Sequence, residues 1–437
     1  MLQLYWHRFL EVQPVLVYMF SYYTLDIVWS HSFGCTECSQ LFLDVVWGEL
    51  TWLKTVFCDV LSSLTASLSE ADMSSTWPAC GGSEIWAPPG GYGLVRCGGL
   101  GEQFPLGGDV VPMPINAYVG SRGTIKDCAC FNVGRDVNSL RGAIVGLGTN
   151  EQVIIEILTH RSNWQRQQIS KEYKGTCGRE LIDDLKGDLS GDFKNAIIAL
   201  MLPPALFDAK ELKRAMEGPG TNENVLIEII ASRTNQQLRE VKEAYQEEYK
   251  SDLAKDITEE TSGDFRKALL LLLEARRDEN CQGVDERLFK TDAEALFKAG
   301  EKRLGTDEIK FIEVLCLRSP SQLQMTFDEY KLLTNKTMED SIKSEMSGDL
   351  KKLMLSLVQC SRSTPAYFAE RIYKSVKGVG TDERTLSRIL VTRSEIDLLD
   401  IQDEYMKAYG KSLYATIEDE TSGDYRTTLL NICEKGN

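Results

Sequence analysis

The sequence has little histidine, no long uncharged hydrophobic run and no excess of basic charge. Only three of its 437 residues are histidines, and only His160 lies beyond residue 131. A catalytic centre that depends on histidine therefore cannot recur along the chain. The formal net charge of −16 opposes binding to nucleic acid, so we expect no nucleic-acid partner. The same negative charge opposes binding to an anionic membrane, unless a cation lies between the two surfaces.

The longest run without a charged residue is Val12–Leu25, which has 14 residues. A membrane-spanning helix needs about 20. Arg8 is placed to begin a signal peptide, but Glu11 lies beside the apolar segment and no clear cleavage site follows. We therefore expect neither a signal peptide nor a membrane anchor.

Because no export signal is expected, the twelve cysteines are predicted to be reduced thiols. Cys35 and Cys38 form a C-x-x-C, but no second pair follows at the spacing of a zinc site. Cys128 and Cys130 are too close in sequence to suggest a framework disulfide.

The N-terminal part differs in composition from the rest. Residues 1–130 hold six of the seven Trp, seven of the twelve Pro and seven of the twelve Cys. Their 5 basic and 12 acidic residues give a net charge of −7. Residues 75–114 are rich in Gly, Pro and Ser, which is typical of a linker or a disordered stretch. We interpret residues 1–118 as a partly disordered extension through which a protein partner could bind.

The remaining residues contain an internal repeat. A string resembling G-x-G-T occurs four times, with its threonines 72, 85 and 75 residues apart. In each copy an Arg-Ser or Arg-Thr pair follows, and then an acidic residue with x-Ser-Gly after it. Three ordered markers that each occur four times predict a repeat architecture.

Hydrophobic residues within each repeat follow a helical period, and no segment alternates like a strand. The glycines are predicted to end one helix and the threonine to cap the next. These signals predict an all-α fold with four or five helices per repeat. A longer polar connection, residues 276–290, is predicted to link two halves. The predicted boundaries are 119–131 for a short tail and 132–203, 204–275, 291–362 and 363–437 for the repeats.

Each repeat also has one carboxylate 42 residues after the start of its loop string. Ca²⁺ takes six to eight oxygens, including backbone carbonyls and carboxylates. A single loop of this kind would be explained by helix capping alone, but the same offset in four loops favours a calcium site. The predicted carboxylates are Asp188, Glu260, Glu345 and Glu420. The predicted carbonyl donors are Ile144, Gly146 and Gly148 in the first loop, Met216, Gly218 and Gly220 in the second, Glu301, Arg303 and Gly305 in the third, and Val376, Gly378 and Gly380 in the fourth.

The loop tips are apolar, which is typical of a membrane interface. They are Leu147, Pro219, Leu304 and Val379. No EF-hand loop, dinucleotide fingerprint, nucleophile elbow or metalloprotease motif occurs, so we predict a protein that is not an enzyme. The arginine of each Arg-Ser or Arg-Thr pair is interpreted as an internal anchor between helices rather than as a phosphate ligand.

With these loops and spacings, residues 119–437 resemble an annexin. The resemblance implies a curved disc of four repeats with about five helices each, whose calcium loops lie on the convex face. It implies reversible, calcium-dependent binding to acidic phospholipids such as phosphatidylserine, by a cytoplasmic protein that becomes peripheral on membranes when Ca²⁺ rises. Inhibition of phospholipase A2 would follow from covering the lipid. Leu304 stands where similar annexins usually carry tryptophan, so insertion there should be shallower.

The resemblance also places Asp208, Glu211, Arg233 and Arg393 at a polar central pore. The same residues would fit a buried ionic network that holds the repeats together. The alternative to calcium-dependent binding is a calcium-independent helical scaffold, in which the aromatic N-terminal region binds a partner or a membrane.

Overall fold

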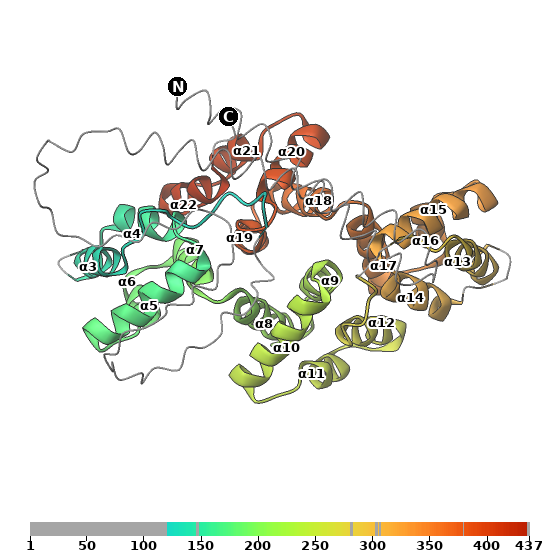
Figure 1. Cartoon of the computed structure of the whole chain (residues 1–437), viewed down its shortest axis with the longest axis horizontal. Coiled ribbons are helices and arrows are strands. Elements are labelled where there is room, and N and C mark those ends of the chain that lie inside the picture. The colour runs from blue at the N-terminus through green and yellow to red at the C-terminus, as the bar shows by residue number, and fades with distance from the viewer. Residues whose placement is uncertain are drawn as a thin grey trace, which may run out of the picture. The chain divides into compact units, whose positions relative to one another are not determined.

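The structure is a computed structural model that describes residues 120–145, 148–279, 283–301, 305, 307–378 and 380–434. These residues form twenty α-helices, α3 to α22, and within them no strand occurs (Figure 1). None of these helices combines the length and the hydrophobicity of a membrane span. The predicted all-α fold is confirmed.

Each repeat consists of five helices. The first repeat contains α3 (Val133–Ile144), α4 (Glu151–Thr159), α5 (Asn163–Cys177), α6 (Leu181–Asp188) and α7 (Gly191–Met201). The second contains α8 (Pro204–Ala215), α9 (Glu223–Ser232), α10 (Asn235–Tyr249), α11 (Leu253–Glu260) and α12 (Gly263–Leu273). The third contains α13 (Glu286–Ala299), α14 (Glu308–Leu317), α15 (Pro320–Thr334), α16 (Met338–Glu345) and α17 (Gly348–Arg362). The fourth contains α18 (Thr364–Val376), α19 (Glu383–Arg393), α20 (Leu398–Tyr409), α21 (Leu413–Glu420) and α22 (Gly423–Cys433).

The sequence markers set the ends of these helices. Ser162 and Thr234, from the Arg-Ser and Arg-Thr pairs, form capping boxes at the starts of α5 and α10. In a capping box the side chains at both ends satisfy backbone N–H groups that the first turn leaves unpaired. The third helix of every repeat then ends on a residue with left-handed backbone, which closes its last turn. These residues are Gly178, Lys250, Asn335 and Gly410.

The hydrophobic core divides into two clusters, each shared by two repeats. One cluster joins repeats 2 and 3, and the other joins repeats 1 and 4. Figure 1 shows the corresponding neighbours, α12 beside α14 and α22 beside α4. The connection between α12 and α13 therefore joins two repeats of one cluster, and the prediction that it links two halves is wrong. Its predicted end at residue 290 is also wrong, because α13 begins at Glu286.

Candidate cation-binding site

The four predicted carboxylates occupy the same place in their repeats. Asp188, Glu260, Glu345 and Glu420 are the last residues of α6, α11, α16 and α21. The acidic-x-Ser-Gly marker produces this ending, because the serine is extended and the glycine that opens the next helix has φ of about +60° in all four repeats. Asp188, Glu260 and Glu420 are exposed and Glu345 is half-buried.

The loop between α8 and α9 is described completely. Met216 caps α8 and is buried, whereas Glu217 to Gly220 are exposed. Gly218 has φ of 95° and Gly220 of 93°, a backbone that other residues rarely adopt. The Asn222 N–H donates to the Ala215 carbonyl over 2.7 Å and closes the loop. Equivalent bonds close the loops of the first and fourth repeats, from Asn150 to Ala143 and from Asp382 to Ser375.

In the second and fourth repeats the loop threonine contacts the residue that carries the predicted carboxylate. The Thr221 hydroxyl lies 3.3 Å from both the carbonyl oxygen and Oε2 of Glu260. In the fourth repeat the Thr381 hydroxyl donates to the Glu420 carbonyl over 3.4 Å. The prediction that these threonines cap the following helix is wrong, because the N-cap is the next residue in each repeat. With Asn222 and Asp382 at the caps, Thr221 and Thr381 bond across to Glu260 and Glu420 instead.

The third loop differs from the others. Its closing bond runs from Asp307 N–H to the Ala299 carbonyl, so it spans eight residues where the others span seven. The Glu301 side chain bonds to Lys336 over 2.6 Å and accepts a hydrogen bond from Ser341 over 3.1 Å. The Glu301 carboxylate is therefore engaged by the α15–α16 region, and only its main-chain carbonyl matches the predicted role.

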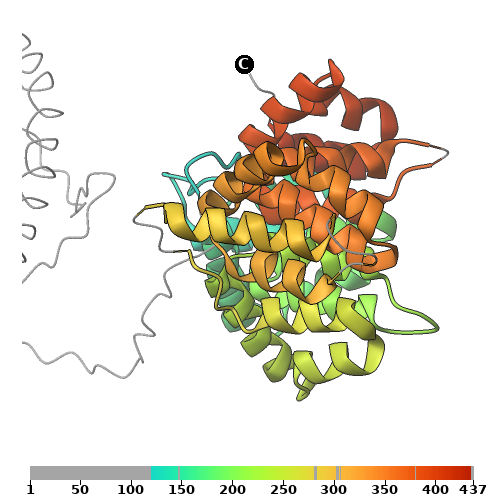
Figure 2. The ribbon, with the colours of Figure 1, turned by 90° about the vertical axis from the view of Figure 1, so that its right-hand side faces the viewer.

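The structure describes most of the predicted site residues. Ile144, Met216 and Val376 are buried at or beside the ends of their helices, and the glycines Gly148, Gly218, Gly220, Gly305, Gly378 and Gly380 are exposed with positive φ. Of the apolar tips, Pro219 is described and exposed. Figure 2 shows the α8–α9 and α18–α19 loops projecting from the same side of the four-repeat unit. Gly146, Leu147, Arg303, Leu304 and Val379 lie outside the described residues.

A tyrosine in each third helix fixes the short helix that carries the carboxylate. Its partner lies eleven residues later in every repeat, and Tyr245 OH donates to Asp256 Oδ2 over 2.5 Å. The other pairs are Tyr173 with Asp184, Tyr330 with Ser341 and Tyr405 with Thr416. Burial raises the pKa of all four tyrosines, which keeps their hydroxyls protonated as donors.

Two acidic hollows lie beside the carboxylates, and each is shared by two repeats. The first, of about 400 Å³, contains Asp188 and Glu420; the second, of about 430 Å³, contains Glu260 and Glu345. Eight further carboxylates, which were not predicted from the sequence, line them: Glu151, Asp192, Glu383 and Asp424 in the first, and Glu223, Asp264, Glu308 and Asp349 in the second. A signal for these was present, since a glutamate stands two residues after each loop threonine and an aspartate four residues after each predicted carboxylate.

Among the described residues, no three acidic, histidine or cysteine side chains converge closely enough to hold a metal ion by themselves. A cation at these loops would therefore draw on backbone carbonyls as well as on the one carboxylate. The exposed glycine-rich backbone of the α8–α9 loop, joined to Glu260 through Thr221, fits this kind of oxygen site.

The arginine of each Arg-Ser or Arg-Thr pair anchors helices inside its repeat, as predicted. Arg161, Arg233 and Arg318 each form two hydrogen bonds to an aspartate of the first helix: Asp136, Asp208 and Asp292. The fourth repeat differs because Phe368 stands at the place of the aspartate. Arg393 instead lies 4.8 Å from the Phe368 ring centroid and pairs with Asp397 over 2.6 Å.

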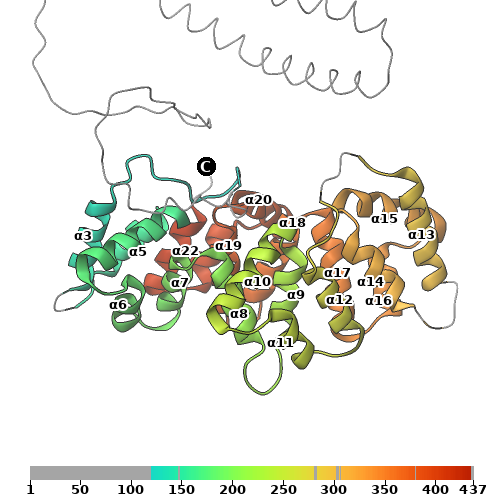
Figure 3. The same cartoon turned by 60° about the horizontal axis from the view of Figure 1, so that its bottom comes forward.

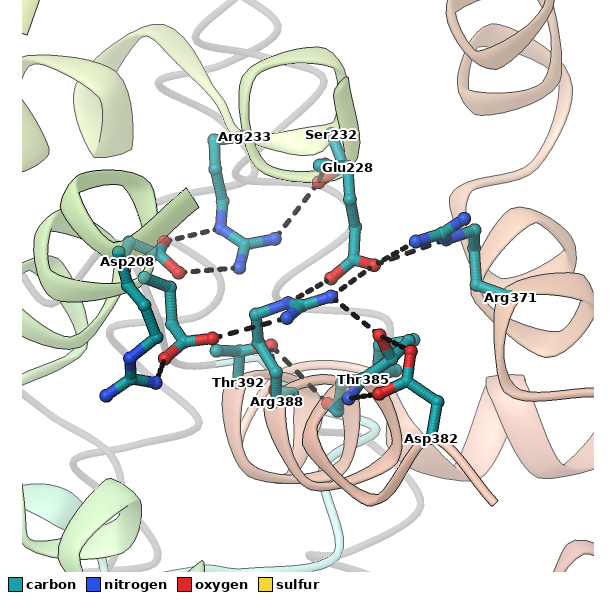
Figure 4. A network of polar contacts seen from close by, with 12 residues as sticks. Asp208, Glu228, Ser232, Arg233, Arg371, Asp382, Thr385, Arg388 and Thr392 are labelled. Atoms are coloured by element: carbon teal, nitrogen blue, oxygen red, sulfur yellow. Dashed lines mark hydrogen bonds and ion pairs between the residues drawn. The ribbon is translucent and has the colours of Figure 1, made fainter. Parts of the chain in front are cut away.

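A buried ionic network connects repeats 2 and 4 (Figure 4). Arg388 of α19 bonds to Glu228 of α9 and to Glu211 of α8, and Arg371 of α18 also reaches Glu228. Burial alone would raise the pKa of Glu228, but Arg388 and Arg371 lower it and hold the carboxylate ionised. The prediction for this centre did not include Arg388, Arg371 or Glu228. The assignment of Arg393 to the centre is wrong, because Arg393 pairs with Asp397 of its own repeat.

The annexin family model matches this chain over residues 135–200, 207–272, 291–357 and 367–432, which are the four repeats. The chain belongs to the annexin family. Annexins are known as calcium-dependent phospholipid-binding proteins and are not known as enzymes. The predicted resemblance is confirmed.

Annexin A3 is among the similar relatives. Annexin A3 of Bos taurus is 57% identical over 316 residues, which cover 72% of this chain and 98% of the relative. Annexin A3 of Homo sapiens is 56% identical over the same shares. The solved structure of annexin III has a TM-score of 0.72 and 55% identity, covering 73% of this chain and 99% of its own. The structure of calcium-bound annexin (Sm)1 has a TM-score of 0.65 and 37% identity, covering 72% and 93%.

Proposed function

We propose that this annexin binds acidic phospholipid membranes when its interhelical loops hold Ca²⁺. In the second repeat the carbonyls of Met216, Gly218 and Gly220 and the carboxylate of Glu260 would hold one ion. The observation that carries the proposal is the contact of Thr221 with Glu260, which joins the loop to the carboxylate across 39 residues of sequence. The corresponding residues of the other repeats are proposed to act in the same way.

The charge of the chain explains why a cation is needed. A net charge of −16 repels an anionic surface, and the two acidic hollows place further carboxylates beside the loops. One carboxylate per loop gives weak binding of Ca²⁺ alone. The bound ion supplies open coordination positions that a lipid phosphate oxygen can fill. Calcium and lipid should therefore each raise the affinity for the other.

Several loops on one side of the unit would act together. Once one loop is bound, the others meet the membrane at a high effective concentration, so the combined affinity exceeds that of a single loop. The apolar tips would then contact the interface, as the exposed Pro219 allows. In this proposal the protein is cytoplasmic and peripheral, prefers phosphatidylserine-like lipids, and withholds substrate from phospholipase A2 by covering the surface.

Sedimentation with phosphatidylserine vesicles tests the proposal. The full chain should sediment with vesicles in Ca²⁺ and stay in the supernatant in EDTA. Vesicles of phosphatidylcholine alone should retain little protein at the same Ca²⁺ concentration. Equal sedimentation in Ca²⁺ and in EDTA would contradict calcium bridging.

Two matched double variants test the site itself. Glu260→Gln with Glu420→Gln removes two proposed ligands and should raise the Ca²⁺ concentration needed for half-maximal sedimentation. Glu259→Gln with Glu418→Gln removes the same charge from exposed neighbours on α11 and α21, and should behave like the natural chain. If both double variants raise the required Ca²⁺ concentration equally, the effect comes from net charge and the ligand assignment is wrong.

The alternative function, a calcium-independent scaffold, depends on residues 1–118, which lie outside the described residues. Removing them separates the two functions. In the proposal above, calcium-dependent sedimentation should survive the deletion. In the alternative, the full chain should bind vesicles equally in Ca²⁺ and in EDTA, and the deletion should abolish that binding.

A further inference from the structure

The segment before α3 is fixed against two repeats. Its Gly120 and Ile125 N–H groups donate to the carbonyls of Glu395 and Ser394 over 2.7 and 3.0 Å, and the Ile125 side chain is buried in the core of repeats 1 and 4. Farther along, Cys128 exchanges two hydrogen bonds with the Gln165 side chain of α5, over 3.0 and 3.1 Å. The chain around Cys128 is therefore held in a defined conformation.

This conformation brings two thiols together. The Phe131 N–H donates to the Cys128 carbonyl over 3.1 Å and closes a tight turn around Ala129 and Cys130. Across the turn the Cys128 and Cys130 sulfur atoms lie 3.4 Å apart. Cys130 is exposed to solvent and Cys128 is half-buried.

The surroundings favour a thiolate at Cys130. The Cys128 thiol, which shares a hydrogen bond with the Cys130 sulfur, lowers the pKa of Cys130, and the Arg135 guanidinium lowers it further. The thiolate is the reactive form of cysteine. Elsewhere in the described part of the chain, Cys316, Cys360 and Cys433 are buried, and burial raises the pKa of each to about 12.

We propose that Cys128 and Cys130 form a peroxide-reactive dithiol site. The Cys130 thiolate attacks one oxygen of hydrogen peroxide, the O–O bond breaks, and the departing hydroxide takes a proton to become water. The Cys130 sulfenic acid that results is then attacked by the Cys128 sulfur. A disulfide forms, and the sulfenic hydroxyl leaves with the Cys128 proton as a second water. Two thiols are oxidised and one peroxide is reduced, so the step balances.

The proposed bridge should be easily reversed. Only Ala129 separates the two cysteines, so the disulfide closes a small ring, and strained disulfides are the more readily reduced ones. The segment also lies on the side of the four-repeat unit opposite to the α8–α9 loop (Figure 3). Oxidation is therefore expected to leave calcium-dependent sedimentation unchanged, and the site is independent of the proposed calcium function.

Peptide mapping of the full chain tests the proposal. Trypsin cleaves after Lys126 and Arg135, so one peptide carries Cys128, Cys130 and no other cysteine. The protein is exposed to hydrogen peroxide, unfolded, treated with iodoacetamide and digested. The expected product is this peptide without alkylation and lighter by two hydrogen atoms than the dithiol. It should form before Cys316, Cys360 or Cys433 lose alkylation, and dithiothreitol should restore the dithiol.

Two single variants assign the roles. In Cys128→Ser the sulfenic acid at Cys130 has no partner and should be trapped by dimedone, whereas in Cys130→Ser the remaining Cys128 should be trapped far more slowly. Circular dichroism confirms that both variants keep the helical fold. The proposal is overturned if the natural peptide stays doubly alkylated, if its cysteines link to other peptides instead, or if Cys128 and Cys130 are trapped at equal rates.

Discussion

Nε of Arg388 donates to Oε1 of Glu228 over 2.7 Å, and both side chains are 1% exposed (Figure 4). The two residues are 160 positions apart and belong to different hydrophobic clusters, since α19 packs with repeats 1 and 4 and α9 with repeats 2 and 3. A buried ion pair is therefore a direct link between the two clusters.

Arg388→Met should destabilise the protein strongly. It leaves the buried Glu228 with Arg371 alone and frees Glu211 from its partner on α19, and breaking a buried pair on one side costs about 3–5 kcal/mol. The urea concentration at half-unfolding, followed by circular dichroism, measures the effect. Arg384→Met, at an exposed position of the same helix, is the control and should unfold like the natural chain. Equal midpoints for the two variants would show that the pair adds nothing to stability.

Asp256 should make stability depend on acidic pH. Burial alone would raise its pKa, but hydrogen bonds from Ser251, Tyr245 and Lys213 outweigh burial and lower it. A carboxyl whose pKa is lower in the folded state stabilises the fold above its unfolded pKa, near 4. This contribution is lost as the pH falls through the folded pKa.

Asp256→Asn should therefore lower stability at pH 7 and flatten the loss of stability between about pH 5 and pH 2. Urea unfolding at a series of pH values measures both effects. Glu259→Gln removes a carboxylate from the exposed face of the same helix and serves as the control. A pH profile of Asp256→Asn that parallels the natural one would contradict this role of Asp256.

Gly220→Ala should damage the second loop through its backbone alone. Gly220 has φ of 93°, and no atom lies within 4 Å of the position that a Cβ would occupy. The strain of placing alanine there should cost about 1 kcal/mol or distort the loop, and so raise the Ca²⁺ concentration needed for vesicle sedimentation. Gly187→Ala in α6 is the matched control, because its Cβ also meets open space and its φ is not positive. A rise of the same size in both variants would exclude loop geometry as the cause.

The repeat markers made much of the site predictable. Local signals set both the end of the helix that carries Glu260 and the turn around Gly218 and Gly220, and they recur four times. Thr221 was assigned to the wrong partner because a threonine before a helix is a common cap, and only the structure shows that Asn222 takes that place.

The pairing of repeats was not predictable in this way. Hydrophobic periodicity identifies the buried side of α9 or α19, but it does not say which repeat covers that side. Arg388 and Glu228 are each ordinary charged residues within a helical pattern, and their contact across 160 residues leaves no local signal. The position of Arg393 was not predictable either. Arg393 was expected at the polar centre, but the Phe368 ring and Asp397 hold it within its own repeat.

Pro219→Asp should weaken membrane binding without changing the fold. Pro219 is the exposed tip between two glycines of positive φ, so its side chain is free to meet the lipid interface. An aspartate there would add repulsion from anionic headgroups and remove apolar contact, which is worth about 25 cal/mol per Å² of buried area. Sedimentation at saturating Ca²⁺ should show a several-fold loss of affinity for phosphatidylserine vesicles.

Val284→Asp is the control for that loss. It adds the same charge at an exposed apolar residue just before the start of α13, whereas the α13–α14 loop follows the other end of that helix. Because α13 has 14 residues and a helix rises about 1.5 Å per residue, the substituted side chain lies roughly 20 Å from the α13–α14 loop. Vesicle binding should therefore be weaker in Pro219→Asp and unchanged in Val284→Asp. A loss of equal size in both variants would mean that total charge, and not the apolar tip, governs contact with the membrane.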